Sequence, residues 1–289
     1  MGKITDFHCG YDNSAGLTKE IAMGTDLTFP MAYEKAESMA ILSKGLKEKD
    51  AADFCQLPFC HTVEGEAMGG LVNLGDENNG PRAKEYLCTT AEEVLELPNI
   101  DFSKGRIAEV LKACRLLREQ GENVVLYISG PFTILNVLME PRYVFKTFKK
   151  KPEMMQRIFD KLQRQILLFI EEAQKSGVNM ISYGDSSGSL NILGPKFSED
   201  VVKMFTYPLL KKIEKNLSSE TLVLLCPKTT YGLLGMEKAQ LKDVDLGSPM
   251  KYGEGCLKAV GRVKFVGEMC INNKKFVLKN GIIKTVNLL

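Results

Sequence analysis

Four side chains capable of acid–base, nucleophilic or metal-binding chemistry stand within seven residues of this sequence. They are Cys60, His61, Glu64 and Glu66, and His61 is one of only two histidines in the chain. A largely apolar stretch over residues 53–59 leads into them and predicts a buried strand. In α/β proteins a buried strand that ends in polar residues commonly positions functional groups. We therefore expect a functional site at this strand end.

Further polar or reactive groups follow four later predicted strands. They are Gly130, Pro131, Phe132 and Thr133 after strand 124–129, Asp185 and Ser186 after strand 178–184, Cys226 after strand 222–225, and Glu268 and Cys270 after strand 263–267. The carboxyl ends of the strands of a parallel barrel meet at one rim. The residues expected together at that rim are Cys60, His61, Asp185, Cys226, Glu268 and Cys270.

The residue types suggest roles for these positions. Zinc takes about four thiolate, imidazole or carboxylate ligands, so Cys226, Cys270 and His61 are the predicted metal ligands. The alternatives are that the cysteines are unligated core residues and that His61 is a hydrogen-bonded structural histidine. Asp185, Glu66 and His61 are the predicted catalytic residues, and the alternative for Asp185 is a helix or turn cap. The residues assigned to cofactor binding are Gly130, Pro131, Phe132 and Ser186.

The rest of the chain supplies elements that could position these groups. The predicted helices cover 103–120, 152–175 and 198–215, the last bent at Pro208, and a last strand is expected over 282–289. A hairpin is expected within 69–90, with its turn at Asn78-Asn79-Gly80. Residues 1–50 are read as an N-terminal helical arm, with a helix over 31–49. Alternating strands and helices predict one domain, 1–289, of the α/β class, for which a (β/α)8 TIM-like barrel fits better than an open doubly wound sheet.

Composition argues against several classes of function. The net charge is +2, from 38 basic and 36 acidic residues, which gives no general attraction to nucleic acid or to an anionic membrane. No apolar run reaches the ~18 residues of a membrane span, and the first ten residues contain no hydrophobic signal region. We therefore expect a cytoplasmic protein whose eight cysteines are reduced. The sequence leaves open whether the chain forms a homo-oligomer.

Three segments together resemble the uroporphyrinogen decarboxylase superfamily. They read LPFCHTVEGEAMGG (57–70), SGPFTIL (129–135) and NMISYGDSSGSLNILGPKFSEDVVKMFTYPLLKKI (179–213). Within that superfamily the likeness is greatest to corrinoid-dependent methyltransferases of the methylcobamide:coenzyme M type, over roughly residues 50–275. The resemblance implies a (β/α)8 barrel that moves a methyl group between a corrinoid, usually held on a partner protein, and a thiol or other small acceptor. It also implies a zinc that holds the thiol as thiolate, bound through a His-x-Cys motif and a later cysteine.

The sequence departs from that pattern in two places. The His-x-Cys position reads Leu224-Leu225-Cys226, so leucine replaces the histidine, and Cys270 is the candidate for the later cysteine. About twenty residues follow Cys270. The barrel is therefore expected to be shortened at this end, with its last elements missing, rearranged or supplied by a partner.

Two alternative functions follow from the same resemblance. A carboxy-lyase like uroporphyrinogen decarboxylase fits less well, because the arginine-rich N-terminal motif of that branch is absent. A non-catalytic member that binds a corrinoid or a partner would be consistent with the loss of the histidine.

Overall fold

The computed structural model describes residues 4–7 and 19–289, and its centre is a seven-stranded, mostly parallel sheet. In spatial order the strands are β1 (Cys55–Leu57), β4 (Val124–Ser129), β5 (Met180–Gly184), β6 (Leu222–Leu225), β9 (Phe265–Val266), β11 (Ile282–Leu288) and β7 (Ala239–Asp245). The first five are parallel, whereas β11 runs antiparallel to both β9 and β7. Helices connect the parallel strands, as the alternating sequence pattern predicts.

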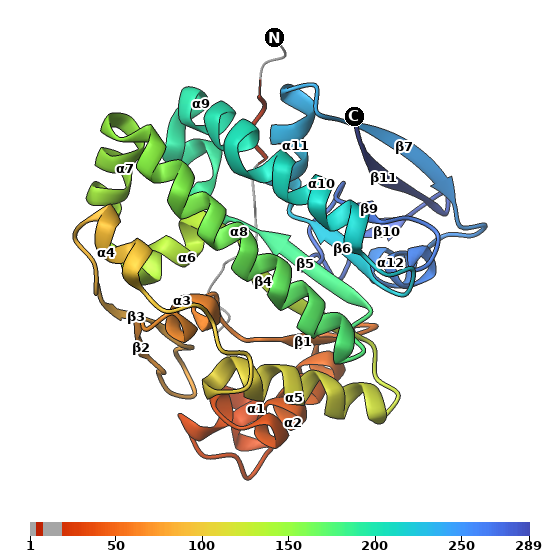
Figure 1. Ribbon diagram of the computed structural model, residues 1–289. Coiled ribbons are helices and arrows are strands. Elements are labelled where there is room, and N and C mark those ends of the chain that lie inside the picture. Colours follow the sequence, from red (N-terminus) through yellow and green to blue (C-terminus); the bar gives the residue numbers. More distant parts are fainter. Residues whose placement is uncertain (1–3, 8–18) are drawn as a thin grey trace.

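Helices cover the outer face of this sheet, where α8 (Pro152–Lys175) packs against β4 (Figure 1). The main outer helices are α2 (Ala36–Lys49), α5 (Gly105–Glu119), α8 (Pro152–Lys175), α9 (Leu190–Val201) and α10 (Tyr207–Asn216). The shorter helices are α1 (Lys19–Met23), η1 (Met31–Tyr33), α3 (Val63–Ala67), α4 (Ala91–Glu96), α6 (Pro131–Leu138), α7 (Pro141–Lys150), η2 (Ser186–Gly188), η3 (Val202–Thr206), α11 (Pro227–Gly235) and α12 (Tyr252–Ala259). Two small two-stranded sheets pair β2 (Leu71–Asn73) with β3 (Arg82–Glu85) and β8 (Met250–Lys251) with β10 (Val277–Leu278).

The two faces of the large sheet bury two separate cores. Because successive side chains of a strand point to opposite faces, Val223 of β6 packs under the outer helices while Leu222 and Leu224 face inward. The inner core also contains Tyr252 and Cys256 of α12. Helix α12 and its flanking segments therefore fill the space that the interior of a complete barrel would enclose.

The predicted TIM-like barrel is present in a shortened form. It has five parallel strands, and in the part of the chain that the structure describes no strand pairing joins β1 to β7. The predicted last strand exists as β11, but it runs antiparallel and pairs along its whole length with β7, which the sequence analysis did not predict. The expected change at this end of the barrel is thus a rearrangement into an antiparallel pair.

Proline accounts for two differences between the predicted and the observed elements. Strand β4 and helix α8 have the predicted bounds, whereas β1 ends at Leu57 because Pro58 has no N–H for the ladder. The helix predicted over 198–215 is divided between α9, the π-helical turn η3 and α10, and Pro208 lies in the first turn of α10, where its missing N–H costs little.

The predicted N-terminal arm contributes side chains to the core. Tyr33 and Met39 are buried in the outer core, and α2 packs against α5. Residues 1–3 and 8–18 of the predicted arm lie outside the described residues.

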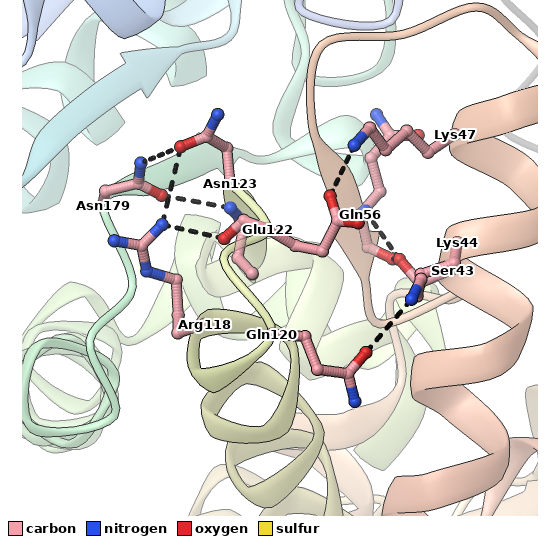
Figure 2. Close-up of polar contacts among 10 residues, drawn as sticks. Ser43, Lys44, Lys47, Gln56, Arg118, Gln120, Glu122, Asn123 and Asn179 are labelled. Carbon is pink, nitrogen blue, oxygen red and sulfur yellow. Dashed lines mark hydrogen bonds and ion pairs between the residues drawn. The ribbon is translucent and has the colours of Figure 1, made fainter.

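The N-terminal ends of the strands are tied together by polar contacts (Figure 2). Asn179 donates a hydrogen bond of 3.1 Å to Asn123, which precedes β4. The Arg118 guanidinium donates to the carbonyl of Glu122 at 2.8 Å, and the Glu122 carboxylate pairs with Lys47 of α2 at 2.5 Å. In barrels this end of the strands mainly provides stability, so the functional groups are expected at the opposite end.

Candidate functional site

A cavity of about 120 Å³ lies at the carboxyl ends of the parallel strands. It is called the thiol chamber here, and its lining includes His61, Tyr127, Ser182, Asp185, Ser186, Leu224, Cys226, Lys228, Cys270 and Asn272. Five predicted site residues, from four different strand ends, therefore line one cavity: His61, Asp185, Ser186, Cys226 and Cys270. Of the six residues expected together at the rim, His61, Asp185, Cys226 and Cys270 line this cavity, whereas Cys60 and Glu268 do not.

A second, larger cavity of about 340 Å³ lies between the β2–β3 hairpin and the same strand ends. It is called the polar chamber here, and its lining includes Cys60, His61, Thr62, Asn78, Asn79, Arg82, Thr133, Asn136, Ser186 and Ser187. His61 and Ser186 line both cavities. The two chambers are thus neighbours that share part of a wall.

Asp185 fixes the N-terminus of helix α6 from the neighbouring strand end. Its Oδ1 accepts hydrogen bonds of 2.8 Å from both the N–H and the hydroxyl of Thr133, and its Oδ2 accepts one of 3.1 Å from the N–H of Phe132. Burial raises the pKa of Asp185, and these hydrogen bonds act in the opposite direction. The structure places this carboxylate in the capping role that the sequence left open, on the wall of the thiol chamber.

Two glycines make room for this carboxylate. A Cβ atom on Gly130 or on Gly188 would lie closer than 3.0 Å to the side chain of Asp185. Gly130 therefore has a steric function that was not predicted. Its predicted role in cofactor binding stays a prediction.

The other residues assigned to cofactor binding differ in position. Phe132 is buried, with its ring edge-on to Phe148 and Phe159 at centroid distances of 6.0 Å, and Pro131 begins α6. Neither of them lines the two chambers, whereas Ser186 lines both. Of this predicted set, Ser186 has the position best suited to contact a ligand.

A buried arginine that the sequence analysis missed organises the loop after β1. Arg106 is only 8% exposed, and its guanidinium donates to Cys60 Sγ at 3.0 Å, to Thr62 Oγ1 at 2.7 Å and, through Nε, to Glu66 Oε2 at 2.7 Å. Burial opposes the charge of Arg106, but the nearby Cys60 and Glu66 outweigh it and raise the pKa of Arg106. An arginine near the start of an otherwise ordinary amphipathic helix gives no local signal of this role.

The two glutamates of the first motif face away from the chambers. Glu66 is paired with Arg106, and Glu64 is buried and accepts a 2.6 Å hydrogen bond from the N–H of Ser129 at the end of β4. Burial raises the pKa of Glu64 despite this hydrogen bond. Both carboxylates hold neighbouring elements in place, and a catalytic role for Glu66 stays a prediction.

His61 lies where the chambers meet and is held neutral. Burial lowers its pKa, and its ring is edge-on to Tyr127 at a centroid distance of 6.1 Å. Tyr127 in turn donates a 2.5 Å hydrogen bond to Asn272 and accepts one of 2.5 Å from Gln56. A neutral imidazole in this position can accept a proton or coordinate a metal.

The predicted zinc ligands line one cavity, but they do not form a ready ligand set. Across residues 4–7 and 19–289, no group of three or more histidine, cysteine or acidic side chains is arranged to hold a metal ion. Leu224, which stands in place of the expected histidine, is buried in the chamber wall and offers no ligand atom. Glu268 is paired with Lys284 at 3.7 Å and does not line the chamber. Zinc binding by Cys226, Cys270 and His61 therefore stays a prediction.

None of the helices that the structure describes is long and apolar enough to cross a membrane.

Comparisons with known proteins place the chain among related sequences. The sequence model of a family described as uroporphyrinogen decarboxylase (URO-D) matches residues 15–268. The chain is 24% identical over 245 residues to a methylcobamide:CoM methyltransferase, MtaA of Methanosarcina barkeri, covering 83% of this chain and 71% of that protein. It is also 24% identical over 224 residues to a methylcobamide:CoM methyltransferase, MtbA of Methanosarcina acetivorans, covering 75% of this chain and 65% of that protein. A solved structure of a methyltransferase from Methanosarcina mazei superposes with a TM-score of 0.65 at 22% identity, covering 81% and 68% of the two chains, which shows a common fold.

Proposed function

Because the chain belongs to the uroporphyrinogen decarboxylase (URO-D) family, we propose that it is an enzyme that moves a methyl group between a corrinoid and a small thiol or other acceptor. The relatives named as methylcobamide:CoM methyltransferases support this choice within the family. The corrinoid would be held by a partner protein and would meet the acceptor at the carboxyl ends of the strands.

The thiol chamber is the observation that carries this proposal. Two cysteines, Cys226 and Cys270, and the neutral imidazole of His61 come from three separate strand ends to line one cavity. Leu224 and Ile271 supply apolar surface to the same cavity. Limited access of water favours methyl transfer to sulfur over side reactions.

The protein residues can assist the transfer in a direct way. The proton of the acceptor thiol passes to His61, because a neutral imidazole is a general base near neutral pH. The resulting thiolate forms the new sulfur–carbon bond, while the cobalt–carbon bond breaks and its electron pair stays with cobalt. Tyr127 keeps its proton, because burial raises its pKa, and its edge-on contact orients the His61 ring.

Zinc is not assigned a step in this reaction. The two cysteines and His61 have the right chemistry for zinc, but the described residues do not assemble a three-ligand set, and Leu224 replaces the remaining expected donor. In this proposal His61 and the lining of the thiol chamber therefore activate the acceptor thiol.

The test is an anaerobic assay with free methylcobalamin and three small thiols: 2-mercaptoethanol, cysteamine and mercaptoacetate. Loss of methyl from cobalt is followed by visible absorbance, and the methylated thiol by mass spectrometry. We expect turnover in the wild type and a loss of about 100-fold or more in His61→Gln, which removes the base that takes the thiol proton. Arg157→Gln, an exposed arginine on α8, is the control and should keep the wild-type rate within about twofold. Full activity in His61→Gln would exclude that imidazole as the base.

A second candidate is a member that binds a corrinoid protein without turnover, and the leucine at position 224 favours it. The same assay distinguishes the two functions. A binding protein would form a complex with its corrinoid partner while the spectrum of the methylated cobalt stays unchanged.

A further inference from the structure

A third cavity, of about 170 Å³, lies beside the polar chamber. It is called the apolar annex here, and its lining is Phe132, Asn136, Pro141, Val144, Phe145, Ser187 and Ile192. Asn136 and Ser187 line both the polar chamber and the annex. A ligand could therefore extend from a polar space into an apolar one past these two side chains.

Several polar side chains around this space form no hydrogen bond with the residues that the structure describes. Within the part of the chain that the structure describes, no hydrogen bond or ion pair is found for the side chains of Asn78, Arg82, Asn136 or Ser187. Asn78 and Arg82 come from the hairpin, whereas Asn136 and Ser187 lie opposite, on α6 and η2. Polar groups left without a partner around a cavity are suited to hydrogen-bond a ligand.

The described residues that line the polar chamber carry positive but no negative charge. Arg82 is its only lysine or arginine, and no aspartate or glutamate is among the described lining residues. Asp76, on the same hairpin, interacts electrostatically with Arg82 but does not line the chamber, and it accepts hydrogen bonds of 2.8 Å from the N–H groups of Asn78 and Asn79. The chamber thus suits a ligand with one negative charge and several hydrogen-bonding groups.

We propose that the polar chamber and the apolar annex together bind a monoanion with an amide between its carboxylate and an apolar tail, which is the chemistry of an N-acyl amino acid. The carboxylate pairs with Arg82 and Asn78 at the hairpin. The amide meets Asn136 and Ser187, which can each donate and accept a hydrogen bond. The acyl chain lies in the annex against Val144, Phe145 and Ile192. This inference goes beyond the proposed methyl transfer, and its test contains no corrinoid.

The test is calorimetric titration of the wild type with N-acetylglycine, N-butyrylglycine and N-hexanoylglycine. We expect one ligand per chain and an affinity that rises about fourfold for each methylene added, as for methylenes that become buried. Arg82→Gln should weaken the binding of every member about tenfold or more, since a charged hydrogen bond is lost. N-hexanoylethanolamine, which lacks the carboxylate, should bind the wild type weakly and be insensitive to Arg82→Gln.

Two further variants separate the annex from the chamber. Ile192→Trp fills the mouth of the annex at a residue that is 50% exposed, so the protein should fold while the dependence on chain length disappears. Arg157→Gln, an exposed arginine on α8, is the matched control and should bind like the wild type. Wild-type binding that is absent, that does not depend on chain length, or that is unchanged in Arg82→Gln would overturn the proposal.

Discussion

The thiol chamber and the polar chamber meet at His61 and Ser186, yet they are built from different parts of the chain. The thiol chamber is lined by residues at or just after all five parallel strands, and its reactive groups are cysteines and a histidine. The polar chamber takes one wall from the β2–β3 hairpin, an excursion outside the repeated βα units, and its groups are amides, hydroxyls and one arginine. The difference suggests a division in which the repeated units supply reactive groups and the inserted hairpin supplies recognition.

The largest expected effect is on metal binding in the thiol chamber, through Leu224→His. Residues two apart on a strand point the same way, so the introduced imidazole would face the chamber together with Cys226. We expect about one zinc per chain in this variant and far less in the wild type, because the change completes a set of one histidine and two cysteines. Elemental analysis of protein purified without oxygen measures the metal, and adding Cys226→Ser should abolish it. Stoichiometric zinc in the wild type would instead mean that a different donor already completes the site.

The next largest effect is on folding stability and concerns the wall of the polar chamber. Arg106→Met should lower the free energy of unfolding by about 3 kcal/mol, because Cys60 and Thr62 lose their buried donor and Glu66 loses its partner. Chemical denaturation measures the change. Arg115→Met, an exposed arginine on the same helix, is the control and should change stability by less than about 0.5 kcal/mol. If both variants were equally stable, the Arg106 contacts would not be what holds the wall of the polar chamber.

Asp185→Asn should also lower the free energy of unfolding, by somewhat less than Arg106→Met. It should affect the walls of both chambers. The amide keeps one acceptor oxygen but directs an N–H₂ group at a backbone N–H of α6, so we expect a loss of about 2 kcal/mol. Thermal unfolding of the variant and of Asp160→Asn, an exposed aspartate on α8, gives the comparison. A neutral effect at Asp185 would argue that the cap is dispensable and that this carboxylate is kept for chemistry.

The smallest effect concerns the shared residue His61. Its pKa is lowered by burial, so the unfolded chain binds its proton before the folded one does as the pH falls. This histidine therefore reduces stability as the pH drops below about 6.5, by up to about 1.4 kcal/mol for each unit by which its pKa is lowered. Proton NMR of His8→Gln, in which only His61 remains, would measure that pKa. A value above 6.5 would contradict the neutral imidazole on which both chambers depend.

Local sequence pattern predicted the parts of the fold that repeat. Strand β4 and helix α8 have long uninterrupted patterns, and Asp185, Cys226 and Cys270 were correctly placed near one another because parallel strands end at a common rim. The antiparallel pair of β7 and β11 was not predicted as a pair, since strand direction depends on a partner more than thirty residues away along the chain.

The binding side of the site was harder to predict. The hairpin turn at Asn78-Asn79-Gly80 was identified, but nothing in those residues indicates that the turn lies over the end of β1 and the start of α6. Arg106 was missed for a similar reason, because its partners Cys60, Thr62 and Glu66 are at least forty residues away in sequence. Both the position of the hairpin turn and the contacts of Arg106 depend on residues that are far apart in the sequence.

The crowding around Asp185 also has an evolutionary consequence. Gly130 and Gly188 come from different elements, and a Cβ atom at either position would lie closer than 3.0 Å to the side chain of Asp185. The three positions are therefore expected to change together during divergence. A descendant with alanine at position 185 would relieve Gly188, which lies against the carboxylate, but not Gly130, which lies against the Cβ atom, so only glycine there would release both positions.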